Sequence, residues 1–222
     1  MGKDRARRVG LLLAAGLWLL LATVGAGASS FFPEFYHGWN PRPGGWSTYH
    51  VRDAVGEEAD VTFAVVEEGG ALWLELRTAS EGVPSVAAFH LQGDPVEDGN
   101  VLAVRARDGE GPAVELDRAA LERLLRQGGR AFGPSALSIG PRMGKLEGLP
   151  DEAVTVGKRK VSCRHLKVVG AEGVEAEVWL SDEVVPFGLV KLVSGDESLV
   201  LTDFGKGARP SLKGPFIPLE VP

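Results

Sequence analysis

Two adjacent carboxylates, Asp182 and Glu183, lie in the stretch EVWLSDEVVPFGLVKL (residues 177–192) and have the side chains that general acid and base chemistry uses. Carboxylate catalysis needs two groups that share one pocket and have different pKa values. Neighbours in a polar turn rarely point into one pocket, and such residues usually hydrogen-bond their own backbone. We therefore predict a chain reversal between two strands, with Pro186 at a strand start or an edge and Gly188 at a bulge or a close backbone approach.

A second pair of reactive side chains is Cys163 and His165, which are two residues apart. On one strand they point the same way, with Cβ atoms about 7 Å apart at a rise of about 3.3 Å per residue. A nucleophile and its base need hydrogen-bond reach and a third, orienting group. A hydrolase that uses this pair is our third hypothesis, and one buried, inert thiol is our interpretation.

The sequence contains no pattern typical of a metal, nucleotide or serine-nucleophile site. It has no cysteine pair, His-x-x-x-His, calcium loop, phosphate-binding loop or Gly-x-Ser-x-Gly elbow. The histidines are far apart along the chain, at His37, His50, His90 and His165. We therefore predict no cofactor, no metal and no catalytic residue, and we expect that the protein is not an enzyme.

The first residues predict export. A basic start that includes Lys3 and Arg8 precedes the uncharged run 9–28, which ends in Ala-Gly-Ala. This is typical of a signal peptide, here residues 1–28, cleaved after Ala28 to give a periplasmic or extracellular protein. The alternative is an uncleaved anchor, since the run approaches the roughly 20 residues that span a bilayer. Only that alternative would place the chain in a membrane.

Charge and cysteine content narrow the partners further. Four of the 24 basic and one of the 30 acidic residues precede residue 29, so 20 basic and 29 acidic residues remain, a formal charge of −9. Phosphate backbones and anionic lipid surfaces repel such a chain, so we expect no nucleic acid partner. A single cysteine excludes an internal disulfide, and the remaining 194 residues suit one domain with a real core.

The chain divides into a leader, one domain and a tail. Residues 29–45 mix aromatics with prolines and glycines, which indicates an irregular leader. The domain, 46–205, is rich in short runs of Val, Leu, Thr and aromatics, and 206–222 contains four prolines and is predicted to run extended over the surface. The predicted strands are 46–55, 60–67, 71–78, 85–91, 101–107, 153–156, 160–169, 174–181, 187–193 and 198–204, with no clear period over 130–150.

One segment, 117–127, predicts an amphipathic helix. Asp117 can accept a hydrogen bond from an early backbone N–H, and the two glycines at 128 and 129 are typical of a helix end. Leu121, Leu124 and Leu125 form a single apolar stripe.

Alternation along the strands predicts one apolar face. We expect the helix to close over it, so that the residues facing a ligand or a core are Phe63, Leu72, Leu74, Leu76, Leu121, Leu124, Leu125, Val178, Leu180, Phe187 and Leu189. Trp73 and Trp179 fall on the more polar faces of their strands, where a pair of exposed aromatics would mark a protein-partner patch.

The segment 158–205 resembles the last third of exported bacterial proteins with the LolA/LolB-like lipoprotein-carrier fold. In them a strand carrying Trp-x-Ser ends and a Val-Pro-x-Gly step leads into the next strand. The matching residues here are Trp179, Ser181, Pro186, Gly188 and Leu189. The resemblance implies an open half-barrel of antiparallel strands with helices on its concave side, and carriage of lipid or acyl chains. This chain offers one strong helix, so we expect a small helical cover.

Together these observations predict a mainly β (α+β) fold, a curved antiparallel half-barrel with one amphipathic helix on the concave side. The leading hypothesis is a non-enzymatic, exported protein that binds or carries a lipid or acyl chain in the cell envelope. The alternative is a structural or adaptor envelope domain with a filled core, which acts through surface contacts with a protein partner.

Overall fold

The computed structural model describes residues 39–52, 55–80, 83–94, 100–126, 145–169 and 175–219. The predicted signal peptide, most of the predicted leader and the predicted hairpin loop at 170–173 lie outside the described residues.

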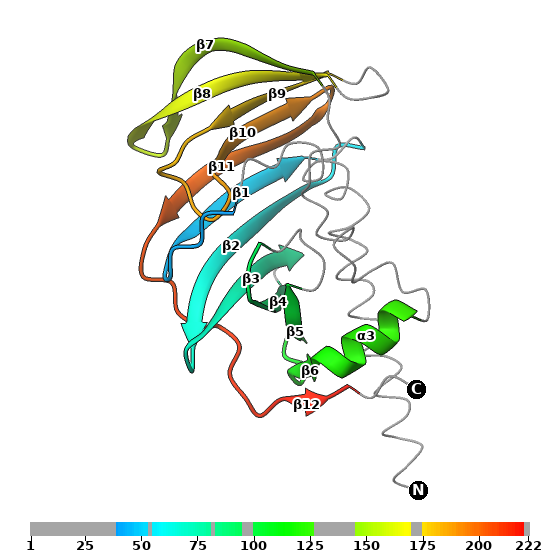
Figure 1. The fold of residues 1–222 in the computed structure, drawn as a ribbon. Coiled ribbons are helices and arrows are strands. Elements are labelled where there is room, and N and C mark those ends of the chain that lie inside the picture. Colours follow the sequence, from blue (N-terminus) through cyan, green and yellow to red (C-terminus); the bar gives the residue numbers. More distant parts are fainter. Residues whose placement is uncertain are drawn as a thin grey trace, which may run out of the picture.

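The strands form one large, open, curved sheet, which confirms the predicted mainly β half-barrel (Figure 1). Neighbouring strands are antiparallel except for β12 and β6, which pair in parallel. Along the sheet the order is β12-β6-β5-β4-β3-β2-β1-β11-β10-β9-β8-β7. The bounds are β1 Trp46–Arg52, β2 Glu58–Glu68, β3 Ala71–Ser80, β4 Val83–Leu91, β5 Val101–Asp108, β6 Val114–Leu116, β7 Lys145–Val156, β8 Arg159–Val169, β9 Glu175–Leu180, β10 Leu189–Ser194, β11 Glu197–Gly205 and β12 Ile217–Pro218.

Several strands differ from the sequence-based expectation. β7 begins at Lys145, inside the segment 130–150 for which we predicted no clear period. The start of this strand is largely exposed and includes a glycine and a proline, so it has no apolar alternation to recognise. Its pairing with β8 also shifts between Leu149 and Glu152. The short β6 and β12 were not predicted. β12 pairs with β6 through backbone hydrogen bonds, for example from Ile217 N–H to the Ala113 carbonyl at 2.9 Å. Backbone pairing of this kind requires no side-chain pattern that the sequence could show.

The turn between β2 and β3 shows how local sequence sets register. Gly69 and Gly70 both have positive φ, 59° and 79°, a conformation that glycine adopts without a steric penalty. The nine paired positions that follow run from Glu68 opposite Ala71 to Asp60 opposite Ala79. The hairpin therefore forms as predicted.

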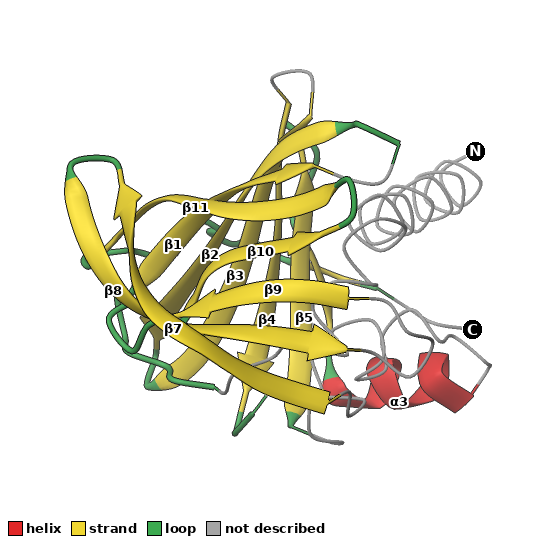
Figure 2. Ribbon diagram, turned by 90° about the horizontal axis from the view of Figure 1, so that it is seen from above, coloured by secondary structure: helices red, strands yellow, loops and turns green. Residues whose placement is uncertain are grey.

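The helix α3 (Arg118–Arg126) also forms as predicted. The backbone N–H of Ala120 donates to Oδ1 of Asp117 at 2.7 Å, which is the expected N-terminal cap. Leu121 is buried in the main core, and α3 packs against β5 and β6 on the concave side, towards one edge of the sheet (Figures 1 and 2). No helix among the described residues is long and apolar enough to cross a membrane.

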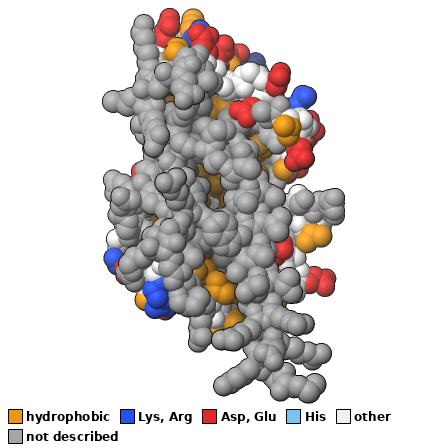
Figure 3. Space-filling model, turned by 90° about the vertical axis from the view of Figure 1, so that its right-hand side faces the viewer, with side chains coloured by type: hydrophobic (Ala, Val, Ile, Leu, Met, Phe, Trp, Pro, Cys, Tyr) orange, Lys and Arg blue, Asp and Glu red, His pale blue; other side chains and the backbone are white. Residues whose placement is uncertain are grey.

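The sheet has an apolar cluster on each of its two faces. The larger cluster covers the concave face and includes Tyr49, Phe63, Leu74, Val104 and Leu116. Figure 3 looks at this side and shows hydrophobic side chains of described residues in the middle, with charged side chains around them. The second cluster, on the opposite face, contains Val66, Trp73, Val86 and Ala88, which alternate with concave residues along their strands.

The segment 206–219, which we call the tail, covers the second cluster. It leaves the end of β11 and runs across the sheet to β12, as the red trace in Figure 1 shows. Leu212 is buried in the cluster, and Phe216 packs beside it. The described part of the tail is a structural layer, because its apolar side chains cover an otherwise exposed face.

The prediction that Trp73 and Trp179 mark an exposed surface is wrong. Each side chain is only 5% exposed. The tail and the Arg105 guanidinium, 4.1 Å from the ring centre, cover Trp73. Trp179 stacks on His165 with ring centroids 4.2 Å apart, and its indole N–H donates to Glu152 at 2.8 Å. Side chains from other strands and from the tail therefore cover each ring and keep it out of water.

Candidate functional site

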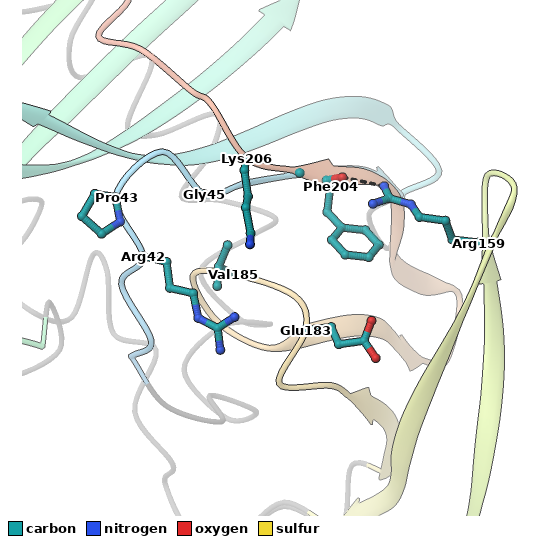
Figure 4. A pocket seen from close by; sticks show the side chains of 9 residues that line it. Arg42, Pro43, Gly45, Arg159, Glu183, Val185, Phe204 and Lys206 are labelled. Atoms are coloured by element: carbon teal, nitrogen blue, oxygen red, sulfur yellow. Dashed lines mark hydrogen bonds between the residues drawn. The ribbon is translucent and has the colours of Figure 1, made fainter.

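A pocket lies where the ends of several strands meet, close to the start of the domain (Figure 4). Its volume is about 470 Å³. Three basic side chains, one carboxylate and an apolar wall line it, namely Arg42, Pro43, Gly45, Arg159, Glu183, Val185, Phe204, Gly205 and Lys206. These residues come from the end of the leader, the hairpin β7–β8, the loop after β9 and the end of β11.

The end of the leader, residues 39–45, is held by backbone hydrogen bonds. Asn40 N–H donates to the Pro186 carbonyl at 2.9 Å, and Gly44 N–H donates to the Val65 carbonyl at 2.7 Å. The Gly44 carbonyl accepts a bond from Ala208 N–H at 2.8 Å. This part of the predicted leader is fixed in place on β2 and on the tail.

The loop 181–188 forms the opposite wall of the pocket. It contains Asp182 and Glu183, for which we predicted a chain reversal and not a catalytic pair. Ser181 N–H donates to the Gly188 carbonyl at 2.7 Å, and Gly188 N–H donates to the Val184 carbonyl at 2.9 Å. The acidic pair sits in a turn between β9 and β10, as predicted, with both residues exposed. Pro186 lies in this loop and does not start a strand, because β10 begins only at Leu189.

Gly45 lets the leader and this loop come together. A Cβ added to Gly45 would lie 2.3 Å from the Val185 side chain and 2.9 Å from the Arg42 carbonyl oxygen. Real Cβ atoms do not approach so closely, so a larger residue here would push the two walls apart. The contact positions Val185 in the lining of the pocket.

Arg159 forms the far side of the pocket and is already engaged. Its guanidinium donates to Oδ1 of Asp203 at 2.7 Å and to the Phe204 carbonyl, and it lies 3.7 Å from the centre of the Phe204 ring. These contacts fix the tip of the hairpin β7–β8 against the end of β11.

The other charged groups are less constrained. Arg42 donates to the Asp182 backbone carbonyl at 3.3 Å, a neutral partner that leaves its charge in place. Lys206 and Glu183 make no hydrogen bond or ion pair with any described residue. In Figure 4 the ends of Arg42 and Lys206 lie beside Val185, and Arg159 lies beyond the Phe204 ring. The pocket can therefore offer two cationic donors next to an apolar wall.

The structure places the predicted apolar residues together. One core cluster contains Phe63, Leu74, Leu76, Leu121, Val178, Leu180, Phe187 and Leu189. Leu72 is half-buried on β3, and the side chains of Leu124 and Leu125 lie outside the described part of the chain. A ligand-lining role for these residues stays a prediction, since a filled core would bury them in the same way.

Several aromatic rings contact one another within the apolar cluster of the concave face. Phe187 packs edge-on against Phe63, with ring centroids 5.2 Å apart, and Trp39 lies 5.8 Å from Phe187. Tyr49 is fully buried beside Phe63, and its hydroxyl donates to the Leu189 carbonyl at 2.8 Å. Burial raises the pKa of the Tyr49 phenol well above its usual range.

Cys163 and His165 do not form a nucleophile and base pair. The Cys163 thiol is 2% exposed and donates to the Val161 carbonyl at 3.4 Å. Burial raises the pKa of this thiol, which disfavours the reactive thiolate. His165 contacts Glu177 at 3.0 Å and stacks on Trp179. Among the described residues, no group of three His, Cys, Asp or Glu side chains could hold a metal ion.

Sequence reasoning missed the basic pocket. More than a hundred positions separate Arg42 from Arg159, and more than forty separate Arg159 from Lys206, so no local spacing connects these three residues. The available signal was the Val-Pro-x-Gly step at 185–188, which predicted a tight loop but not what packs against it.

Comparisons with known proteins identify no family for this chain. No family model and no curated protein sequence matches this chain. Among solved structures, the crystal structure of MucB aligns with 90% of this chain and 61% of its own, at 17% identity and a TM-score of 0.42. A structure of PNGF-II aligns with 73% of this chain and 27% of its own, at 9% identity and a TM-score of 0.31. The chain thus spans less than two thirds of either structure, and at these values neither likeness bears on activity.

Proposed function

We propose that this protein is an exported, non-enzymatic binding protein that holds a lipid or acyl chain against the concave face of its half-barrel. The proposal rests on one observation. A single apolar cluster extends over the concave side of the sheet and includes residues of β1, β2, β3, β4, β5, β8, β9, β10 and β11. The resemblance of residues 158–205 to the LolA/LolB-like carriers suggests the ligand class, and the basic start and apolar run at 1–28 support export.

The physical basis of binding is the transfer of methylene groups out of water. Each buried methylene contributes about 0.8 kcal/mol, so ten of them would offset the loss of translational freedom on binding. The described helix packs on β5 and β6, at one edge of this face. A chain-like ligand would therefore lie along the strands beyond the helix, and it would have to part the side chains packed around Phe63, Leu74 and Leu76, which are each at most 5% exposed.

A second function, an envelope adaptor with a filled core, is favoured by a specific observation. The rings of Phe63, Phe187 and Tyr49 are in edge-to-face contact, and each side chain is at most 5% exposed. Such packing is typical of a protein interior. In that case the protein would act through its surface, with the apolar face serving only stability.

Mass spectrometry distinguishes the two functions. The chain would be purified without detergent, measured under native conditions and then extracted with organic solvent. A binding protein is expected to carry an acyl species and to take up a fluorescent fatty acid, cis-parinaric acid, in a saturable way. A native mass equal to that of the polypeptide, with no saturable uptake, would favour the adaptor.

Two neighbouring alanines on β4 provide matched variants. Ala87 lies on the concave face in the main core, and Ala88 lies on the opposite face beneath the tail; both are buried. Ala87→Leu is expected to weaken fatty acid uptake because its extra atoms occupy the ligand's side of the sheet. Ala88→Leu should leave uptake unchanged, and circular dichroism would show that both variants are folded. Equal effects of the two changes would contradict binding at the concave face.

A further inference from the structure

We propose that the pocket at the strand ends is a second binding site, specific for a small organic anion that carries one carboxylate or phosphate group on an apolar body. This site is separate from the concave face, and the inference does not depend on the lipid-binding proposal. It rests on the charges, volume and wall of the pocket.

Charge is the first argument. The pocket has three basic residues and one acidic residue, in a chain whose residues after Ala28 have a formal charge of −9. Asp203 neutralises Arg159, but no described carboxylate pairs with Arg42 or Lys206. Two cations that line one pocket without a carboxylate partner among the described residues form a local positive field, and a negative ligand group would relieve their mutual repulsion.

Donor geometry is the second argument. A guanidinium presents a planar set of N–H donors that fits the oxygens of a carboxylate or a phosphate, and a lysine ammonium adds a point charge. Arg42 uses one of its nitrogens on the Asp182 carbonyl, which positions the guanidinium and leaves other donors available. The hydrogen bonds from Asn40 and Gly44 hold the leader residues that carry this side chain.

Volume and lining define the rest of the ligand. A space of about 470 Å³ is far larger than one phosphate or carboxylate group, and it lies in the range of small-molecule pockets. Phe204, Val185 and Pro43 form its apolar wall. The anion would therefore carry an apolar body, such as a ring, that lies against Phe204.

Glu183 limits how much negative charge the site accepts. It lines the same pocket and has no ion-pair partner among the described residues. Its carboxylate would repel a second negative group on the ligand. A ligand with a single oxyanion group is therefore favoured over one with several.

Calorimetric titration of the purified full chain tests the proposal. Phenyl phosphate and benzoate are the probes, inorganic phosphate lacks the apolar body, and benzyl alcohol lacks the charge. We expect saturable binding of at least one of the two organic anions, at a dissociation constant below about 10 mM, and weaker binding of the other two compounds. The stronger of phenyl phosphate and benzoate identifies the preferred oxyanion. Binding should weaken when salt is raised, because the contacts are partly exposed.

Matched variants locate the site. Lys206→Met and Arg42→Met should each weaken binding about 10-fold, the usual effect of one charge-assisted contact. Lys213→Met, an exposed lysine further along the tail and outside the pocket, should not change it. Glu183→Gln should tighten binding about three-fold, a gain that structural damage would not produce.

Three results would overturn the proposal. One is equal binding of benzyl alcohol and the anions, which would make the charge irrelevant. Another is equal loss in the Lys206 and Lys213 variants, which would place the ligand elsewhere. The third is no saturable heat from either organic anion in a chain shown to be folded by circular dichroism.

Discussion

The buried carboxylate of Glu75 offers the sharpest test of how the tail is attached. Glu75 is 1% exposed on β3 and accepts four hydrogen bonds. Arg77 donates from Nε at 2.9 Å and from Nη2 at 2.6 Å. Ser211 in the tail donates from its backbone N–H at 2.9 Å and from Oγ at 2.7 Å. Arg77 also donates to the Arg209 carbonyl, so one carboxylate organises the middle of the tail.

Glu75→Gln is nearly isosteric but removes the charge. The amide oxygen can serve some of the four donors, while the amide NH₂ would face donors that it cannot satisfy. Removing one partner of a buried ion pair costs about 3–5 kcal/mol, and a hydrogen bond to a charged group contributes about 1.5–3 kcal/mol. Because the Arg77 side chain is 31% exposed, water can solvate it in the variant, and we expect a loss near 3 kcal/mol.

Urea unfolding followed by circular dichroism would measure the free energy of unfolding by linear extrapolation. Glu122→Gln is the matched control, since Glu122 lies on the exposed face of α3 with Arg118, and its loss should stay below about 0.5 kcal/mol. Trypsin cleavage after Lys206 and Lys213 should accelerate only in the Glu75 variant. A loss under about 1 kcal/mol with unchanged cleavage would refute the role of Glu75 in holding the tail.

Three further predictions concern groups buried by tertiary contacts. Because burial raises the pKa of Tyr49, the folded state keeps a proton that the unfolded chain releases above about pH 10, so stability should fall as pH rises beyond that point, by at most about 1.4 kcal/mol per pH unit. Thermal melts from pH 8 to pH 11 should show a smaller decline in Tyr49→Phe, and equal slopes would contradict this. Arg105 lies 4.1 Å from the ring centres of both Trp73 and Phe216 and pairs with Glu115, so Arg105→Lys should lower the free energy of unfolding by about 1–2 kcal/mol in urea titrations; no change would mean that the stacking is dispensable. The Cys163 thiol should react with Ellman's reagent at pH 8 at least about 100-fold more slowly in the folded chain than in guanidinium chloride, and similar rates would show that it is accessible.

The predictions that the structure confirms depend on contacts between residues close in sequence. Alternation of apolar and polar residues identified most of the strands because a strand's side chains point alternately to its two faces. Asp117 identified the start of α3 because a cap and its helix are adjacent. The glycines at 69 and 70 identified a hairpin because the turn requires positive φ at those positions.

The predictions that failed concern which face of a strand is covered, and by what. Trp73 and Trp179 have polar neighbours along the chain, so alternation placed them towards water. In the folded chain the tail covers Trp73, and side chains from neighbouring strands cover Trp179. Alternation indicates that a strand has two unlike faces, but it does not show whether a distant segment covers the second face.

Periodicity and turn chemistry over a few residues predicted most of the strands, the described helix and the apolar side of the sheet, but not β6, β12 or the start of β7. The curved half-barrel was expected from the resemblance of residues 158–205 and not from any local pattern. The second layer that the tail forms is visible only in the folded chain, because Ser211, the partner that Glu75 holds, is 136 positions away. The tertiary structure also brought Arg42, Arg159 and Lys206 around one pocket. The physical reason is that charge clustering and the covering of a sheet face depend on which distant segments meet, and these long-range contacts leave no spacing pattern in the chain.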